Sequence, residues 1–393
     1  MLDRNFILHL SLIEGVGSAV VAAIMKNKGS DVKASDLYSF SMQDWMQVYG
    51  LKEATAAKVV DGLFDKIMLT TELDLIARHD IKWASLFDDE YPQLLREIYM
   101  PPIILYWRGG DFNNRDKCLA IVGARASNDY GMRVVHTLVP DVVSAGLVVV
   151  SGGALGIDTH AHRATLNSGG KTIVVLGSGL LNLYPLSNTK LFDAIIGNGG
   201  IVLSSFPLRF APLARNFPAR NRIIAGLSHA CLVVQAAEKS GALITAHYAL
   251  EQGRDVFAIP GMFDDELSVG CHNLIKRGAK LIASAHDIIE EYGIARSAVP
   301  DKQLMLHDAV QYVKKERVET KNNNATAVKA TSLLDGCTDV QKIIIGACAI
   351  PVSLDDIIQK TELDVSQIQS ELFNLQLDGK VSQNFVGMWV CAQ

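Results

Sequence analysis

Short, continuous apolar runs dominate the centre of the chain, from about Cys118 to Tyr292. Because these runs do not alternate apolar with polar residues, they are typical of strands covered on both faces. Stretches with helical spacing, such as residues 132–145 and 244–252, separate them. This alternation predicts a doubly wound, Rossmann-like parallel α/β sheet. The predicted strands are residues 119–122, 147–150, 172–176, 201–203, 231–234 and 256–259, with a possible edge strand at 280–282.

The segments on either side of this sheet are helical in pattern. Residues 1–75 contain glycine turns at Gly15 and Gly50, each followed by a helix of small and aliphatic residues, which is typical of a helix-hairpin-helix or SAM-like domain. Such turns can offer backbone N–H groups to a phosphate, although tight turns between helices would explain the same glycines. The end of the chain predicts three helices and a hairpin, the arrangement of a winged-helix domain. We therefore expect a helical domain at 1–75, a connecting extension at 76–117, a Rossmann-like domain at 118–295, a linker at 296–332 and a winged-helix domain at 333–393.

Composition narrows the class of protein. The 393 residues are 49% hydrophobic, which excludes a mostly disordered chain. No uninterrupted apolar run reaches membrane-spanning length, and charged residues interrupt the apolar start, so we expect neither a membrane span nor a signal peptide. The six cysteines are scattered without zinc-site spacing, as in a reducing compartment. We expect a cytoplasmic protein.

A local excess of positive charge suggests an anionic ligand. Between Ala194 and Ala237 the chain has no Asp or Glu, although its formal net charge is −5. Arginines without carboxylate partners repel one another, a cost that usually means an anion is expected. Phosphate is the commonest such anion. The arginines in this segment are Arg209, Arg215, Arg220 and Arg222.

Small residues follow nearly every predicted strand, at the edge of the sheet where ligands of parallel sheets bind. Examples are Gly123, the stretch 151–153, and Gly177. Ser240-Gly241 opens a predicted helix, whose N–H groups and dipole favour an anion. Since the first strand is not followed by the G-x-G-x-x-G pattern of a dinucleotide site, we expect no cofactor. Several phosphate-sized cradles on one edge of the sheet fit a polyanion better than a single cofactor.

Catalysis finds little support in the residue spacing. Asp158-Thr-His160-Ala-His162 could be part of a metal cluster, but a helix start capped by Asp explains it equally well. Cys271-His272 could be a thiolate–imidazole pair, but nothing orients it. We therefore expect no enzyme and no metal site. Two alternatives stay open: an enzyme acting on a nucleoside 5′-monophosphate, with Asp158 or Glu251 as its carboxylate, and a regulatory nucleotide sensor.

Taken together, these motifs resemble the DprA/Smf family of bacterial DNA-processing proteins. The resemblance covers roughly half of the chain. It includes Ala120-Ile-Val-Gly-Ala-Arg125, Ser151-Gly-Gly-Ala-Leu-Gly-Ile-Asp158, and Tyr184-Pro185. It continues in order through residues 216–226, 240–246, 259–261 and 270–281.

The resemblance implies a non-enzymatic mediator of DNA recombination that acts in competence and natural transformation. Such a protein binds incoming single-stranded DNA, protects it, helps load the RecA recombinase, and dimerises through its Rossmann-like domain. By their positions in the family pattern, Arg125 and Lys171 would contact the phosphates. Without the resemblance, Lys171 could also be an ordinary solvated lysine at the end of a strand. Combined with the loops and arginines above, the predicted DNA-binding residues are Gly123, Arg125, Ser151, Gly152, Gly153, Lys171, Gly177, Arg215, Asn216, Arg220, Asn221, Arg222, Ser240, Gly241 and Thr245.

The chain also departs from the family pattern. Leu155 stands where the family commonly has Arg, Ala219 where a basic residue is frequent, and Gln235 where an acid is usual. The two missing cations suggest that this protein contacts fewer phosphates than its relatives do. Phe210 and Phe217 are the candidates for base stacking, with Phe217 also able to act as a staple beneath its loop. The third helix of the winged-helix domain, residues 365–377, lacks Lys and Arg, which favours a structural or protein-contact role over major-groove reading.

Overall fold

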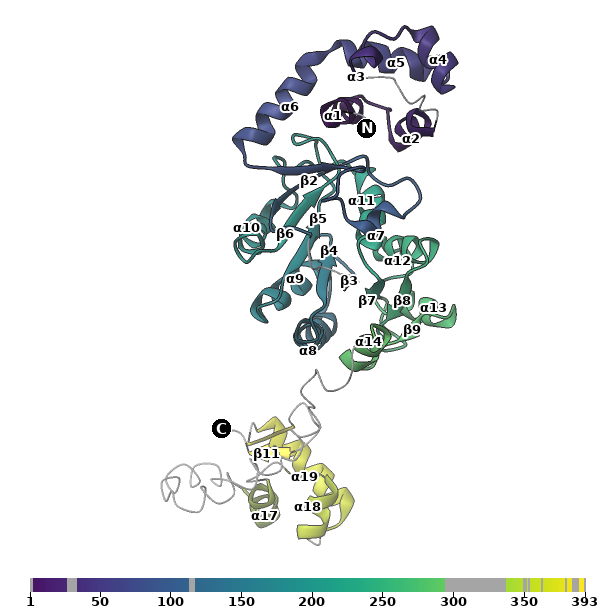
Figure 1. Cartoon of the computed structure of the whole chain (residues 1–393). Helices are drawn as coiled ribbons and strands as arrows, with labels where there is room; N and C mark the ends of the chain where they lie inside the picture. Colours follow the sequence, from purple (N-terminus) through teal and green to yellow (C-terminus); the bar gives the residue numbers. More distant parts are fainter. Residues whose placement is uncertain are drawn as a thin grey trace. The chain divides into compact units, whose positions relative to one another are not determined.

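Figure 1 shows the chain, whose structure is a computed structural model that divides into two units, Met1–Pro300 and Asp301–Gln393. The predicted linker at 296–332 lies outside the described residues. These are residues 3–26, 34–112, 117–293, 337–348, 352, 354–361, 363–378, 380–383 and 389–391.

The first unit is built on one nine-stranded sheet, with the strand order β1-β2-β6-β5-β4-β3-β7-β8-β9. Strands β3 to β9 pair in parallel, which confirms the predicted Rossmann-like sheet. Each predicted strand is found within two residues of its expected bounds. The strands are β1 (Lys82–Ser85), β2 (Ile104–Gly109), β3 (Cys118–Val122), β4 (Val148–Ser151), β5 (Thr172–Val175), β6 (Ile201–Ser204), β7 (Ala230–Val233), β8 (Asp255–Ala258) and β9 (Lys280–Leu281).

The sheet is larger than predicted. The segment 76–117, expected only to connect two domains, supplies β1 and β2, and β2 pairs antiparallel with β6. The feature of the sequence that indicates β2 is the apolar run 103–107, whose side chains are all buried in the structure. The sheet therefore begins before residue 118, the expected start of the Rossmann-like domain.

Helices cover both faces of the sheet, which explains the continuous apolar runs. In β3, Leu119 and Ile121 pack with α8 (Asp129–Ser144), α9 (Ile157–Asn167) and α14 (Ala285–Glu291). The alternate residues, Ala120 and Val122, pack on the opposite face. There the covering helices are α7 (Gln93–Arg96), α11 (Asn216–Gly226), α12 (Gly241–Glu251) and α13 (Val269–Lys276) (Figure 1).

The N-terminal helices share a core with the sheet. Phe6 and Leu75 belong to the same buried apolar cluster as Tyr106 of β2 and Val174 of β5. Phe192 of α10 (Thr189–Gly197) joins that cluster. The helices are α1 (Arg4–Leu12), α2 (Ser18–Lys26), α3 (Ala34–Leu37), α4 (Met42–Tyr49), α5 (Glu53–Phe64) and α6 (Lys66–Arg78).

The glycines of the predicted N-terminal turns have backbone angles that favour glycine. Gly50 ends α4 with a φ of 64°, and Gly15 has a φ of 83°. Both angles lie in the left-handed region, where a side chain is strained. Tight turns between helices therefore account for both residues.

A buried carboxylate ties α6 to the loop that follows β6. Glu72 Oε1 accepts a hydrogen bond of 2.8 Å from the backbone N–H of Leu208. Glu72 is only 6% exposed, and burial raises the pKa of its carboxyl. The N-terminal helices are thus joined by a polar contact, as well as by the shared core, to the loop that leads into α11.

The second unit has the predicted winged-helix arrangement. It contains α17 (Asp339–Ala347), α18 (Leu354–Thr361), α19 (Val365–Leu377) and the antiparallel strands β10 (Val381–Gln383) and β11 (Trp389–Cys391). Glu371 of α19 accepts a hydrogen bond of 2.7 Å from Gln341 of α17, so this acid takes part in contact between helices. In the described parts of both units, no helix is long and apolar enough to cross a membrane.

Replacing Glu72 by glutamine should change stability in a pH-dependent way. Because the folded pKa is raised, ionisation of Glu72 lowers the free energy of unfolding as pH rises above about 4.5, its ordinary value. The amide oxygen of Glu72→Gln can still accept from Leu208. We expect this variant to be at least as stable as the wild type at pH 8, with the difference shrinking toward pH 5, in urea unfolding measured across that range.

The variant Glu72→Leu is the matched control. It leaves the buried N–H of Leu208 without an acceptor, so it should be about 1–3 kcal/mol less stable than Glu72→Gln at every pH. A Glu72→Gln variant whose relative stability falls as pH rises would contradict the raised pKa.

Candidate nucleic-acid interface

A cleft of about 590 Å³ opens at the carboxyl ends of β3 and β7. These neighbouring strands mark the point where the strand order reverses, since the chain runs outward from β3 on one side and from β7 on the other. Ligands of doubly wound sheets bind at such a point. The predicted site residues that line the cleft are Gly123, Arg125, Arg220, Asn221, Ser240, Gly241 and Thr245.

The start of α12 forms one wall of this cleft. Ser240 is the N-cap, and its side chain accepts a hydrogen bond of 3.3 Å from Ala242 N–H. Asn221 of α11 donates to the carbonyl of Gly241 at 3.2 Å, which joins the two helices. A helix N-terminus at the cleft favours an anion there. The predicted helix start is confirmed.

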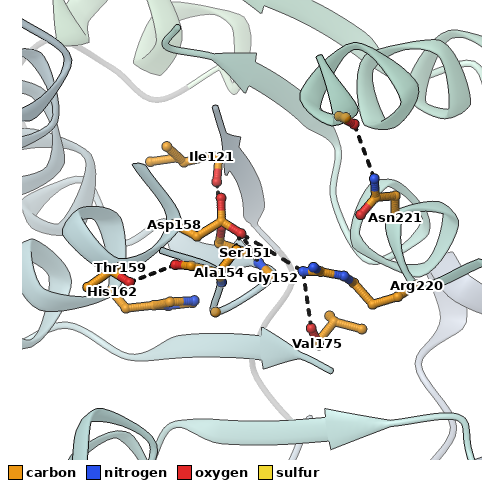
Figure 2. Close-up of polar contacts among 12 residues, drawn as sticks. Ile121, Ser151, Gly152, Ala154, Asp158, Thr159, His162, Val175, Arg220 and Asn221 are labelled. Carbon is orange, nitrogen blue, oxygen red and sulfur yellow. Dashed lines mark hydrogen bonds and ion pairs between the residues drawn. The ribbon is translucent and has the colours of Figure 1, made fainter. Parts of the chain in front are cut away.

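Two of the residues that line the cleft, Asp158 and Arg220, form a buried charge pair (Figure 2). Arg220 Nη1 is 3.9 Å from Asp158 Oδ2 and 3.4 Å from the carbonyl oxygen of Val175, to which it donates. Both side chains are at least 90% buried. The expectation that these arginines lack carboxylate partners is therefore wrong for Arg220, because its partner, Asp158, comes from a distant part of the chain, the start of α9.

Burial outweighs attraction for both members of the pair. Burial lowers the pKa of Arg220 to about 10 although Asp158 opposes this, and burial raises the pKa of Asp158 although Arg220 opposes it. Buried ion pairs of this kind add little net stability. The pair instead holds the loop after β4 in a fixed position against α11.

The loop after β4 is internally satisfied. Its N–H groups at Gly152 and Ala154 donate to Asp158 Oδ2, at 3.1 and 3.3 Å, and Ser151 Oγ donates to the carbonyl of Ile121 at 2.6 Å (Figure 2). A Cβ at Gly152 would lie 1.2 Å from Arg220 Nη1. These N–H groups thus hold the protein's own carboxylate, and Ser151, Gly152 and the buried Gly153 lie beneath the cleft without lining it.

Contacts within the protein also explain why a glycine stands at Gly177 and an asparagine at Asn216. A Cβ at Gly177 would lie 3.0 Å from the ring of Phe217. Asn216 donates to the carbonyls of Gly177 and Ala211, at 3.0 and 3.1 Å. These contacts agree with the predicted role of Phe217 as a staple. Asn216 and Phe217 both belong to α11, so Phe217 packs from a helix and not from a loop.

The predicted cations separate into two groups. Arg125 and Arg215 are exposed, and the Arg125 guanidinium lies 5.0 Å from the ring centre of Phe217. Arg222 instead donates to the backbone carbonyls of Tyr99, at 2.6 Å, and Met100. Lys171 precedes β5 and therefore lies at the amino end of the strand, the opposite edge from the cleft. The structure does not bring Arg222 or Lys171 to the cleft.

Family models and known relatives identify the family of this chain. The family model described as DNA recombination-mediator protein A matches residues 82–293, and that of the DprA winged helix domain matches residues 345–384. Protein Smf of Synechocystis sp. is 38% identical over 75% of this chain and 76% of its own length. The chain belongs to the DprA/Smf family.

Two further comparisons support the assignment. The DNA processing protein DprA of Streptococcus pneumoniae is 48% identical over 53% of this chain and 73% of its own length. An X-ray structure of DprA from Streptococcus pneumoniae has a TM-score of 0.65 and 37% identity, over 74% of this chain and 99% of that one. The chain is thus a DNA-processing protein of the DprA/Smf family.

The departures from the family pattern have different structural settings. Gln235 is buried, and its amide donates to Asn128 Oδ1 at 2.8 Å while accepting from Asn128 N–H at 3.3 Å. It therefore supports the start of α8 without lining the cleft. Ala219 is exposed on α11, and Leu155 is half-exposed beside Arg125.

The groups considered for catalysis are engaged elsewhere. His162 is buried, with Nδ1 2.8 Å from Thr172 Oγ1. Glu251 faces His247 at 3.2 Å and does not line the cleft. Cys271 Sγ lies 3.7 Å from the carbonyl of Val233. Within the described ranges, no group of three or more His, Cys, Asp or Glu side chains could hold a metal ion.

Breaking the Asp158–Arg220 pair on one side should be costly. In Asp158→Ala, Arg220 stays buried without its counter-charge and two backbone N–H groups lose their acceptor. We expect a loss of about 3–5 kcal/mol in the free energy of unfolding, measured with urea.

The double variant Asp158→Ala/Arg220→Met separates the pair from simple packing. Removing both charges should cost less than Asp158→Ala alone, because no unpaired charge remains. The single variant Arg220→Met completes the comparison: if its loss and that of Asp158→Ala simply add in the double variant, the two side chains do not interact.

Proposed function

We propose that this protein is a non-enzymatic recombination mediator that binds single-stranded DNA through the phosphates at the β3–β7 cleft. The observation that carries the proposal is the convergence of Arg125, the N-terminus of α12 and the buried Arg220 on one cleft. Membership of a family described as a DNA recombination mediator supports it. Each charge-assisted hydrogen bond to a phosphate would contribute about 1.5–3 kcal/mol before screening by salt.

An elongated polyanion suits this edge of the sheet better than a mononucleotide substrate. Arg215 adds an exposed cation at the start of α11, beyond the residues that line the cleft. Catalysis on a nucleoside 5′-monophosphate needs a carboxylate at the sugar. Asp158 lines the cleft, but its side chain is about 90% buried, accepts two backbone hydrogen bonds and is paired with Arg220, so it is poorly placed to act as a base.

The wider role is proposed from the family. We propose that the protein acts in the cytoplasm, protects the incoming strand during natural transformation and helps load RecA. A homodimer through the Rossmann-like domain would align neighbouring strands. Exposed apolar side chains near the β8–β9 edge support this interface: Met262, Phe263 and Leu281 are 72%, 90% and 46% exposed.

Fluorescence anisotropy of labelled oligonucleotides across a salt series tests the DNA site. The log–log salt slope should be about −0.7 per phosphate neutralised on a single strand. Arg125→Ala should weaken binding by roughly 10- to 150-fold and shrink this slope by about 0.7. Single strands should bind more tightly than duplexes of the same length.

Lys171→Ala is the matched control, since it removes one positive charge at the opposite edge of the sheet. It should leave both affinity and slope unchanged. Equal losses in the two variants would contradict the placement of the strand in the cleft. Wild-type protein without salt-dependent oligonucleotide binding would overturn the proposed function.

Replacing Phe263 by aspartate tests the dimer. A charge in the middle of an apolar contact should weaken association at least tenfold, because a buried carboxylate lacks a partner there. Sedimentation at micromolar concentrations should show a wild-type dimer and a Phe263→Asp monomer. A monomeric wild type, or an unchanged dimer in the variant, would contradict this interface.

A further inference from the structure

The loop between β3 and α8, residues 123–128, carries the exposed Arg125 at the edge of the cleft. Its first half is held by α9, because the backbone N–H of Ile157 donates to the carbonyl of Ala124 at 3.2 Å. Its second half ends at Asn128, the N-cap of α8. Because Arg125 lies between these two points, the direction of its side chain depends on how both ends of the loop are held.

Asn128 joins the end of this loop to the first turn of α8 and to the end of β7. Its side-chain oxygen accepts from the backbone N–H groups of Tyr130 and Gly131, at 3.0 and 3.2 Å. The same oxygen accepts from the amide of Gln235, two residues beyond β7, at 2.8 Å. Gln235 Oε1 in turn accepts from the backbone N–H of Asn128 at 3.3 Å. Gln235 therefore binds both the side chain and the backbone of the residue that ends the loop.

The surroundings of Gln235 fix the direction of both amides. Gln235 is 1% exposed, and a Cβ at Gly131 would lie 2.1 Å from its Oε1, so this glycine makes space for the amide. Backbone N–H groups only donate. Since one of them faces the oxygen of Gln235 and two face the oxygen of Asn128, the group between the two side chains must be the NH₂ of Gln235. A group that only accepts cannot replace it.

Asn128 also contacts the loop after β8. Its Nδ2 donates to Asp265 Oδ2 at 3.4 Å, and Asp265 Oδ1 accepts from the backbone N–H of Leu267 at 3.0 Å. Leu267 lines the cleft. Turning the Asn128 amide round would place its oxygen against the Asp265 carboxylate and its NH₂ against the N–H groups of α8. The direction of Asn128 is thus fixed from two sides, and the loop after β3 is joined to the loop after β8.

We infer that Gln235 and Asn128 are positioning residues for DNA binding, which hold the loop after β3 in the conformation that presents Arg125 to the strand. This inference rests on the proposed function and adds to it two residues that do not line the cleft. A loop that is already ordered loses less conformational entropy when a ligand binds. The hydrogen bonds of Gln235 and Asn128 therefore contribute to affinity through Arg125 and without contact with the strand.

A double-mutant cycle tests this dependence, with the affinity for fluorescein-labelled oligo(dT) measured by anisotropy. Gln235→Met resembles glutamine in shape and removes both hydrogen bonds to Asn128. It should weaken binding by roughly 2- to 12-fold and reduce the salt slope. It should cause no further loss when Arg125→Ala is already present. A purely structural defect would weaken binding equally in both backgrounds, and that result, or unchanged affinity in Gln235→Met, would overturn the inference.

A second variant adds a test by rescue. In Gln235→Glu at pH 8, the ionised carboxylate has no proton to donate to Asn128 Oδ1, so affinity should fall by a similar factor. Adding Asn128→Ser should restore most of it, since a serine hydroxyl can cap α8 and donate to the carboxylate. A loss that Asn128→Ser does not reduce would contradict the positioning role and leave the proposed function intact. Failure of wild-type protein to bind oligo(dT) would overturn both.

Discussion

The buried pair of Asp158 and Arg220 is the constraint on which the candidate site depends. Asp158 lies in the first turn of α9, on one face of the sheet, and Arg220 lies on α11, on the other. Neither charge could be buried alone at acceptable cost, so the two helices must approach each other across the sheet edge. Gly152 is required for the same reason, because any side chain there would occupy the position of the Arg220 guanidinium.

Around this pair the loops after three successive strands converge on α11. The loop after β3 brings Arg125 to the ring of Phe217, the loop after β4 leads into Asp158 at the start of α9, and the loop after β5 leaves space for the ring at Gly177. Arg220 also lies 5.7 Å from that ring. Contacts within the protein therefore hold the residues of the cleft in place, and such pre-organisation lowers the entropic cost of binding.

The sequence predicted the parallel sheet and part of the site. Buried strands leave a local signature, and Arg125, Ser240 and Gly241 could be placed because each follows a strand or opens a helix. The partner of Arg220 could not be predicted, since an ion pair between two helices far apart in the sequence leaves no local pattern. A glycine after a strand also does not reveal whether it makes space for a ligand or, as at Gly152, for a side chain of the protein.

Lys171 and Arg222 were also predicted at the candidate site, and the structure places them elsewhere for different reasons. Lys171 comes just before its strand, so its position at the amino edge could be read from the sequence once the strand was recognised. The orientation of Arg222 could not, because its acceptors are the carbonyls of Tyr99 and Met100, in a segment interpreted only as a connection. β2 also lies in that segment. Its apolar run is visible in the sequence, but its antiparallel pairing with β6 is not.

The core shared by the N-terminal helices and the sheet has a consequence for how the protein can be divided. The match to the family model begins at residue 82, yet Tyr106, Val174 and Phe192 are covered by the helices that precede it. A fragment starting at Lys82 would expose this apolar face to water. The family match therefore begins at a residue where the hydrophobic core of the first unit has no boundary, and the N-terminal helices belong to the same folded unit as the sheet.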